Sequence, residues 1–270
     1  MSFIKNKDKE LVYYTIESFE KTDLVKHGFS TRLGGVSSGE TESLNFGSKN
    51  KDTMENIWKN YKIFTKSLGI DVGDLVLTNQ VHKDKVLEVD EKDRGKGLTV
   101  ESDIRGVDGL ITNKKGLALA TFHADCTPLF FLDPVQKAIG LAHAGWKGTL
   151  SGIGQKTIEK MIKAYASDPK DILVGIGPSI GGCCFEVGEE VIDILKENFK
   201  DAEKYFHKKD KGKFMLDLWS VNKDQFLDIG ILEENITESK MCTKCNKDIF
   251  FSHRGDNGKT GSLAAMMELR

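Results

Sequence analysis

The feature that most limits the fold of this chain is a run of three apolar segments between residues 116 and 145. "GLALATFH" and "TPLFFLDP" are separated only by Asp125 and its two neighbours, and "KAIGLAHAG" follows the turn at Asp133 and Pro134. Short apolar segments bounded by turn residues are typical of buried strands. The pattern therefore predicts three strands in close succession, with a bend required at Asp125.

Helical patterns alternate with further strands. Apolar residues recur at helical spacing from Met54 to Leu68, and Gly69 follows as a predicted cap. The same reasoning predicts helices over residues 149–166, 189–199 and 216–230, and strands over 74–82, 85–89, 171–181 and 248–256. The order lacks the regular strand–helix repeat of a TIM barrel, and no GxGxxG or Walker motif occurs.

Length and charge exclude several classes of protein. The 270 residues are ample for a hydrophobic core, and a net charge of −2 gives no basic field for nucleic acid. No apolar run approaches the ~20 residues that span a bilayer, so no membrane association is expected. Because the first residues are polar, we expect a cytoplasmic enzyme. Five cysteines, an odd number, argue against a disulfide framework.

Several predicted strands end in residues that can carry chemistry. Strand ends that meet at one edge of a sheet commonly form a site. One cysteine and two histidines can hold zinc and leave a fourth position open. Cys126 and His143 are the first two candidates, and spacing alone leaves the third open among His82, His123 and His253.

Two further patterns have weaker interpretations. In "LAHAGWKG", Lys147 precedes a helix predicted to start near residue 150, and a helix N-terminus beside a lysine suits an anion. "CTKC" has the CxxC spacing of half a zinc site. Cys183 and Cys184 are a poor second pair, because adjacent side chains diverge on an extended backbone. We therefore interpret Cys242 and Cys245 as structural or incidental.

Eight short motifs, in order over residues 30–261, resemble the YfiH-like or laccase-domain proteins, the multicopper polyphenol oxidoreductase family. They are "STRLGGVSSG", "SLNFG", "TNQVHKDKV", "DGLIT", "ADCTPLFFLDP", "GLAHAGWKG", "GIGPSIGGCCFEVG" and "FFSHRGDNGKTG". The resemblance implies a single domain over residues 1–270. It also implies an α+β fold in four layers, with a central mixed β-sandwich flanked by helices, related to the Cys–His toxin deamidases.

The resemblance also implies an activity and a metal. Family members are understood as purine nucleoside phosphorylases, acting on adenosine, inosine, guanosine or methylthioadenosine, with adenosine deaminase activity. The family's metal ligands correspond to His82, Cys126 and His143, with zinc expected and copper as the alternative. Lys83, Gly255 and Ser262 depart from the family pattern, and the last two lack a positive charge that is often present there.

Roles for the remaining residues follow from these motifs and from chemistry. With purine nucleosides and phosphate as the binding partners, we expect Arg32 and Lys147 to hold the anion. Asn45 and Gln80 are expected to bond to the sugar or the base. Asp125 is the candidate proton carrier or the carboxylate that orients a ligand.

Three other functions compete with this interpretation. In a metal-free Cys–His hydrolase or amidase, Cys126 would be the nucleophile and His143 or His82 its base. A copper-dependent polyphenol oxidase would need many histidines in His-x-His pairs, whereas this chain has six histidines and no such pair. A binding module without turnover is the third alternative.

Overall fold

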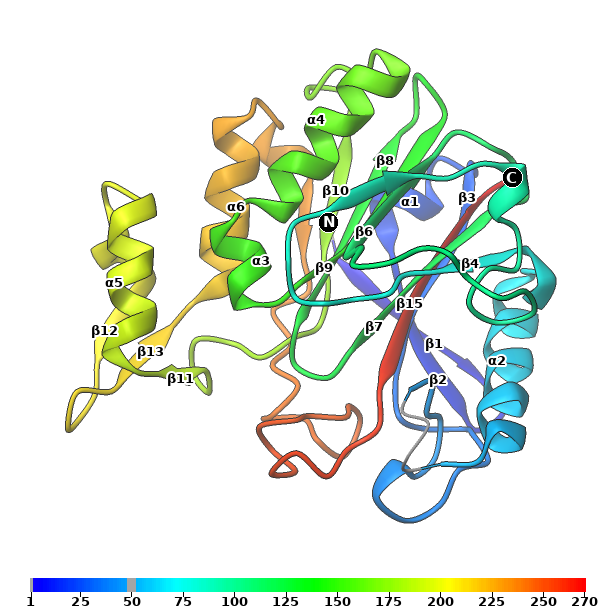
Figure 1. Ribbon diagram of the computed structural model, residues 1–270, viewed down its shortest axis with the longest axis horizontal. Helices are drawn as coiled ribbons and strands as arrows, with labels where there is room; N and C mark the ends of the chain where they lie inside the picture. The colour runs from blue at the N-terminus through cyan, green and yellow to red at the C-terminus, as the bar shows by residue number, and fades with distance from the viewer. Residues whose placement is uncertain (1, 48–51) are drawn as a thin grey trace.

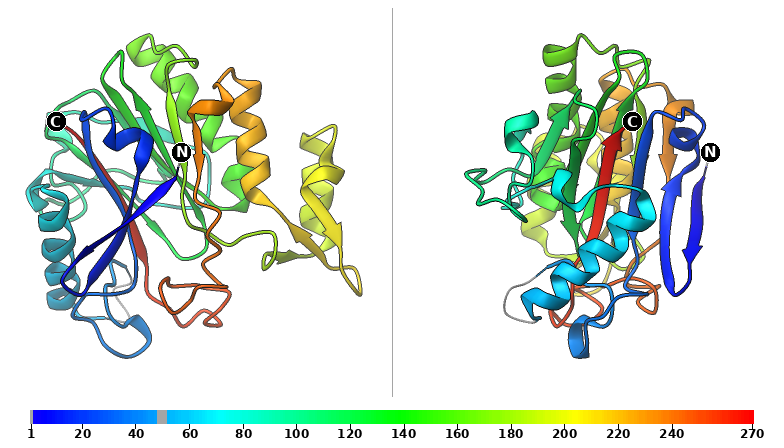
Figure 2. Two further views of the ribbon diagram at one scale, coloured as in Figure 1. Left: turned by 180° about the vertical axis from the view of Figure 1, so that it is seen from behind. Right: turned by 90° about the vertical axis from the view of Figure 1, so that its right-hand side faces the viewer.

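The computed structural model describes residues 2–47 and 52–270, and two six-stranded sheets packed face to face form its centre (Figures 1 and 2). The first sheet has the order β1 (Phe3–Asp8), β2 (Leu11–Ile16), β3 (Val25–Ser30), β15 (Leu263–Leu269), β7 (Ala118–His123) and β4 (Leu75–Leu77). The second has the order β14 (Ile236–Glu238), β10 (Leu173–Ile176), β8 (Thr127–Asp133), β9 (Ala138–Ala144), β6 (Gly109–Thr112) and β5 (Val86–Glu88).

Both sheets are mixed. Most neighbouring strands are antiparallel, and the pairs β4–β7, β5–β6 and β10–β14 are parallel. The two inner faces share one core, which contains Phe29, Leu119, Phe130 and Leu141. Alternate residues of the same strands point outwards to a helix layer, as expected for strands with a side-chain period of two.

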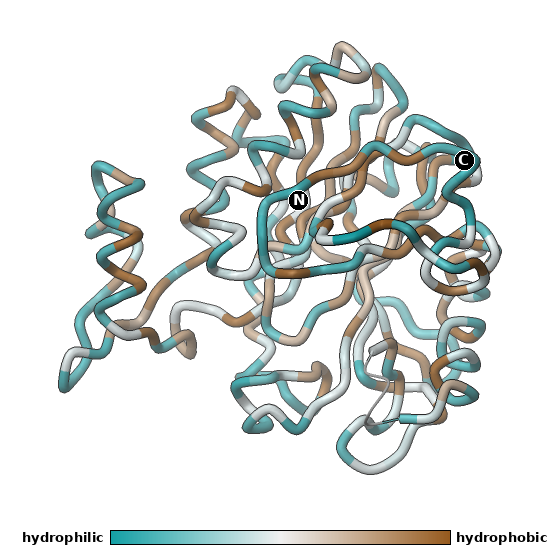
Figure 3. The backbone as a smooth tube through the Cα atoms, in the orientation of Figure 1, coloured by the Kyte–Doolittle hydropathy of each residue, from teal (hydrophilic) through white to brown (hydrophobic). Residues whose placement is uncertain are grey.

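Helices cover both outer faces, which confirms the four-layer α+β arrangement (Figure 1). On the first sheet lies α2 (Met54–Leu68), which buries Ile57, Tyr61 and Phe64 and ends at Gly69 with a left-handed φ of 70°. On the second sheet lie α3 (Trp146–Leu150), α4 (Ile153–Tyr165) and α6 (Leu218–Asp228). Figure 3 shows hydrophobic runs along the central strands and alternation along these helices.

A smaller unit projects from the sandwich at the left of Figure 1. It consists of β11 (Glu186–Val187), β12 (Phe206–Lys208), β13 (Phe214–Leu216) and α5 (Glu189–Asn198). Its apolar cluster, which includes Ile192, Leu195, Tyr205 and Leu216, continues into α3 and α6 of the main body through Leu150 and Val221. The short α1 (Glu17–Glu20) follows β2. No helix among the described residues is long and apolar enough to cross a membrane.

Two predicted elements were wrong. The helix expected over residues 149–166 is divided, because Gly152 takes a left-handed φ of 74° between α3 and α4, and α3 starts at Trp146. The strand expected over residues 248–256 is a series of turns, in which Ile249 and Phe250 both donate to the carbonyl of Asn246. Phe250 and Phe251 are fully buried in the sandwich core, which explains the apolar pattern without strand pairing.

A buried histidine in β3 makes stability depend on pH. The Nε2 atom of His27 accepts the N–H of Ile16 at 2.7 Å, and therefore carries no proton. Burial, with a smaller contribution from the charge of Arg270, lowers the pKa of His27 to about 3. The unfolded chain, with a histidine pKa near 6.5, thus binds this proton before the folded chain does.

We expect the contribution of His27 to the free energy of unfolding to be complete above about pH 6.5 and to fall towards pH 3, by up to about 1.4 kcal/mol per pH unit. His27→Gln keeps an acceptor that does not titrate. Urea unfolding of both proteins between pH 7 and pH 4 should give a shallower slope for the variant. Parallel curves would contradict the assignment.

Candidate functional site

The strand topology brings two connections to the same end of the sandwich. Residues 78–85 lead from β4 to β5, and residues 124–126 lead from β7 to β8, so each connection crosses from the first sheet to the second. Since β4 and β7 are parallel neighbours, both connections leave from the same end of the first sheet. His82 lies on one and Cys126 on the other. His143 lies in β9 opposite Pro128 of β8, close to the point where β9 ends at the same end of the sandwich.

The structure brings together the three predicted metal ligands. The donor atoms of His82, Cys126 and His143 all lie within 4.8 Å of one another. The two imidazole rings are 4.8 Å apart at an angle of 84°. The third position, which spacing left open, is thus occupied by His82 rather than His253. His82 is exposed, Cys126 half-buried and His143 buried, so the site opens to solvent on one side.

Asp108 organises this group, and the sequence analysis did not identify it. It precedes β6 and is fully buried. One of its carboxylate oxygens lies 2.9 Å from both the His143 Nδ1 and the backbone N–H of His82. The other accepts the N–H groups of Val81 and Lys83. Burial alone would raise the pKa of Asp108, but these hydrogen bonds lower it, so the carboxylate stays charged.

The arrangement fits a metal ion of the zinc class. With Nδ1–H of His143 donated to Asp108, its Nε2 keeps a free lone pair for a cation. Two imidazole nitrogens and one sulfur are ordinary zinc donors, and three protein ligands leave a position for a reactant. His123 differs, because its nitrogens are bonded to the Thr121 hydroxyl at 2.8 Å and the Cys126 carbonyl at 3.1 Å.

Burial also affects the alternative of a cysteine nucleophile. Burial away from water raises the pKa of the Cys126 thiol to about 12, and the negative charges of Asp125 and Asp108 make smaller contributions in the same direction. Burial lowers the pKa of His143 and outweighs the opposing effect of Asp108. A thiolate–imidazolium pair is therefore disfavoured here, whereas a cation would stabilise the thiolate directly.

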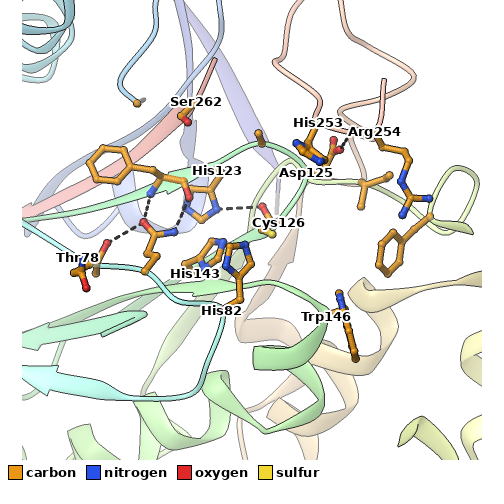
Figure 4. Close-up of a pocket in the computed structure, with 17 residues that line it drawn as sticks. Thr78, His82, His123, Asp125, Cys126, His143, Trp146, His253, Arg254 and Ser262 are labelled. Atoms are coloured by element: carbon orange, nitrogen blue, oxygen red, sulfur yellow. Dashed lines mark hydrogen bonds between the residues drawn. The ribbon is translucent and has the colours of Figure 1, made fainter. Parts of the chain in front are cut away.

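A cavity of about 650 Å³ opens above the three ligands (Figure 4). Its volume is in the range of small-molecule sites. Trp146 stands at one side of it, and His253 and Arg254 lie beside Asp125 on another wall. The remaining lining residues are Gly47, Thr78, Asn79, Gln80, Phe122, His123, Ala124, Ile180, Phe185 and Ser262. Aromatic side chains, two basic residues and the three potential metal ligands thus face the same cavity.

Of the residues predicted to bind the nucleoside, Gln80 lines the cavity but Asn45 does not. The Gln80 side-chain amide is hydrogen-bonded to the end of β7. It donates to the carbonyl of Phe122 at 2.8 Å and accepts the N–H of the same residue at 2.7 Å. The buried Asn45 donates to the Gly47 carbonyl and accepts the N–H of Ser262, so it shapes the wall from behind.

The two predicted anion holders lie apart. Arg32 donates to the carbonyls of Glu42 and Lys247 and stacks over Phe251 at 4.6 Å, outside the lining of the cavity. Lys147 is exposed on α3 and lines a neighbouring cavity of about 420 Å³, which shares His82 and Trp146 with the first. Arg254, to which the sequence pattern assigned no role, is the arginine that faces the main cavity.

Asp125 has the predicted bend, with a left-handed φ of 83°. One of its carboxylate oxygens accepts the Thr243 hydroxyl and the other the backbone N–H of Arg254, both at 2.6 Å. Its own carbonyl accepts the N–H of Ile180 at 2.9 Å. Asp125 therefore ties three separate segments of the cavity wall together.

The cysteines outside this site also converge, which corrects an expectation. Cys183 and Cys184 do not lie on an extended backbone but in a turn, where Cys184 and Phe185 both donate to the carbonyl of Gly181. The turn lets both side chains approach Cys245, with Sγ–Sγ distances of 3.7 and 3.4 Å.

Gly145 explains why the histidine of β9 is followed by small residues. A Cβ atom there would lie 3.1 Å from both the Cys126 Sγ and the His82 ring, although its φ of −72° suits any residue. We expect Gly145→Ala to push the two ligands apart and to weaken zinc binding several-fold in competition with a chelating dye. Gly140→Ala, which crowds α4 from the same strand, should lower stability instead. Equal zinc affinity in both variants would contradict this reasoning.

Comparisons with known proteins agree with the fold. The chain is 37% identical over 244 residues to "Purine nucleoside phosphorylase YlmD" of Bacillus subtilis, covering 90% of this chain and 88% of that protein. It is 34% identical over 189 residues to "Adenosine deaminase RL5" of an unknown prokaryotic organism, covering 69% and 72%. The crystal structure of Bacillus licheniformis hypothetical protein YfiH superposes with a TM-score of 0.92 at 35% identity, covering 99% of both chains.

The family assignment rests on most of the chain. A family model described as "Multi-copper polyphenol oxidoreductase laccase" matches residues 26–270. YlmD from Geobacillus stearothermophilus, 33% identical in its solved structure, superposes with a TM-score of 0.91 over 99% of both chains. Sequence and fold thus agree, and the chain belongs to the multi-copper polyphenol oxidoreductase laccase family.

Proposed function

We propose that this protein is a purine nucleoside phosphorylase that also deaminates adenosine in the same cavity. The observation that carries the proposal is the convergence of His82, Cys126 and His143 beneath a cavity of about 650 Å³. The names of the relatives support the same chemistry, since they include proteins named purine nucleoside phosphorylase and a protein named adenosine deaminase.

Phosphorolysis breaks the bond between sugar C1′ and the base nitrogen, joins a phosphate oxygen to C1′ and leaves the base with a proton. The protein must therefore bind an anion beside the sugar and hold the flat base. Phe122, Trp146 and Phe185 offer aromatic surface to the purine. Zinc held by the three ligands would supply Lewis acidity to the reacting group.

We assign phosphate binding to Arg254, because it is the arginine that lines the main cavity. Asp125 positions it by accepting its backbone N–H. Lys147 is the second cation, at the mouth shared with the neighbouring cavity. Arg32 is not part of this proposal, since it does not line the main cavity. The Arg254 guanidinium is held at the cavity wall by the Glu186 carbonyl, to which it donates at 2.7 Å, and by the Phe185 ring beneath it.

Arg254→Gln should raise the KM for phosphate at least about tenfold, as expected when a charge-assisted contact is lost. Deamination of adenosine, which needs no phosphate, should change much less. Lys147→Gln should have a smaller effect on the same KM. Steady-state kinetics at varied phosphate separates the two. If both activities of Arg254→Gln fell equally, the residue would hold the nucleoside or the fold.

The decisive experiment incubates the zinc-loaded protein with a panel of purine nucleosides, with and without phosphate, and separates the products by chromatography. Free base and ribose 1-phosphate should form only with phosphate, and adenosine should also yield inosine without it. The His143→Ala protein is the blank for contaminating enzymes. Absence of base release from every nucleoside would overturn the phosphorylase assignment, and absence of inosine would overturn the deaminase assignment alone.

A further inference from the structure

The four cysteines that the catalytic cavity does not use form a compact group. The sulfur atoms of Cys183, Cys184, Cys242 and Cys245 all lie within 4.8 Å of one another, although they come from two segments far apart in the chain. The Sγ–Sγ distances from Cys245 to Cys184 and Cys183, 3.4 and 3.7 Å, are far longer than the ~2.05 Å of a disulfide. They approach the ~3.8 Å edge of a tetrahedron with Zn–S bonds of about 2.3 Å.

The local backbone is arranged for sulfur ligands on both sides. In the first segment, a turn at Gly181 directs Cys183 and Cys184 to the same side. In the second, Asn246 donates to the carbonyl of Cys242 and closes the turn that contains the CxxC spacing. The N–H of Gly181 also points at the Cys242 Sγ, 3.3 Å away. Such amide donors stabilise a ligating thiolate.

We propose that these four cysteines bind a second, structural metal ion of the zinc class, separate from the one at His82, Cys126 and His143. Four thiolates with tetrahedral spacing select a soft divalent cation such as zinc, and they leave no position open for a reactant. This site is therefore structural, and it does not depend on the proposed reaction.

The site connects the cavity wall to the projecting unit. Ser179 pairs with Cys242 in a β-bridge, in which Ser179 donates to the Met241 carbonyl and accepts the N–H of Thr243. The hydroxyl of Thr243 donates to Asp125. The turn that holds Cys183 and Cys184 leads directly into β11 and α5. A metal ion here would fix the wall formed by Ile180, Phe185 and Arg254, and would anchor the unit seen at the left of Figure 1.

The test counts metal ions in the full chain, produced with zinc and a thiol reductant, by mass spectrometry of the elements. We expect two zinc ions per wild-type chain, one in Cys245→Ser, one in His82→Ala and none in the double variant. Cys245 is exposed, so its replacement should not prevent folding. Lys244→Ser, an exposed position within the same turn, is the matched control and should keep both ions.

Cobalt provides an independent readout. Replacing zinc by Co²⁺ in His82→Ala should give the intense sulfur-to-cobalt absorption of several thiolates, and Cys245→Ser should weaken it in that background. One zinc ion in the wild type with no loss in Cys245→Ser would overturn the proposal. So would an intact mass, measured without reductant on freshly purified protein, that showed these cysteines already joined in disulfides. Both readouts are independent of nucleoside turnover, so the failure of the proposed function would leave them unchanged.

Discussion

Cys126→Ala should lose the metal ion of the catalytic site and both proposed activities. We expect kcat/KM to fall by more than about 100-fold, beyond the ~10–100-fold typical of residues that only orient a ligand. The reason is geometric, since Cys126 is the one sulfur among three donors that lie within 4.8 Å of each other. Two imidazoles alone would leave zinc with too few protein ligands.

Metal content and activity must be measured together, because a metal-free cysteine hydrolase would also lose activity in this variant. His82→Ala separates the two mechanisms, as it removes a donor while Cys126 and His143 remain. The metal hypothesis expects loss of zinc and of turnover in both variants. His207→Ala, a histidine on β12 in the projecting unit, should change neither. Full activity of the wild type after exhaustive removal of metal would contradict the metal hypothesis.

The elements that were predicted most accurately are those whose hydrophobic pattern can be seen within the segment itself. The strands β7, β8 and β9 are apolar because both faces of their sheets are covered, and α2 has one apolar stripe closed by Gly69. These patterns follow from burial and periodicity alone. The four-layer arrangement was expected from the family resemblance, since no local pattern states which sheet faces which.

Predictions failed where long-range packing overrides local pattern. Phe250 and Phe251 look like strand residues because they are buried, yet they close the end of the sandwich from a turn. Cys183 and Cys184 converge on Cys245 because a turn replaces the extended backbone. In both cases the residue types were informative about burial or chemistry, but the backbone conformation depends on segments far away in the chain.

The sequence indicated which three side chains converge, but not which residues support them. Among the residues assigned to substrate, Arg32 and Asn45 do not line the cavity and are hydrogen-bonded to neighbouring backbone groups. Asp108 was missed, although "DGLIT" places an aspartate directly before an apolar strand. A carboxylate at a strand end is common, and only the fold shows that the loop of His82 wraps around this one.

Asp108→Asn should weaken zinc binding and turnover by about 10–100-fold, the range for a partner that orients a metal-binding histidine. The native carboxylate only accepts hydrogen bonds, and it receives them from His143 and from three backbone N–H groups. An asparagine must replace one acceptor with an N–H₂ donor. If that donor faces His143, it bonds to Nδ1 and moves the ring proton to Nε2, which can then no longer bind metal.

If the amide is turned the other way, its N–H₂ group faces the N–H groups of Val81 and Lys83 and leaves these part-buried donors without an acceptor in the protein. That orientation removes two hydrogen bonds, each contributing about 0.5–1.5 kcal/mol, and loosens the loop of His82. Both orientations therefore damage the site, by different routes. Proton NMR of the imidazole N–H groups distinguishes a changed His143 tautomer from a displaced loop.

Asp133→Asn is the matched control, because Asp133 is also fully buried and accepts the N–H groups of Val135 and Gln136, at the far end of β8. Both of these bonds go to one oxygen, so an asparagine can keep them. This variant should retain zinc affinity and turnover. If Asp108→Asn folds and binds zinc as tightly as Asp133→Asn does, the carboxylate does not set the His143 tautomer, and the ligands are oriented by the strand pairing of β8 and β9 alone.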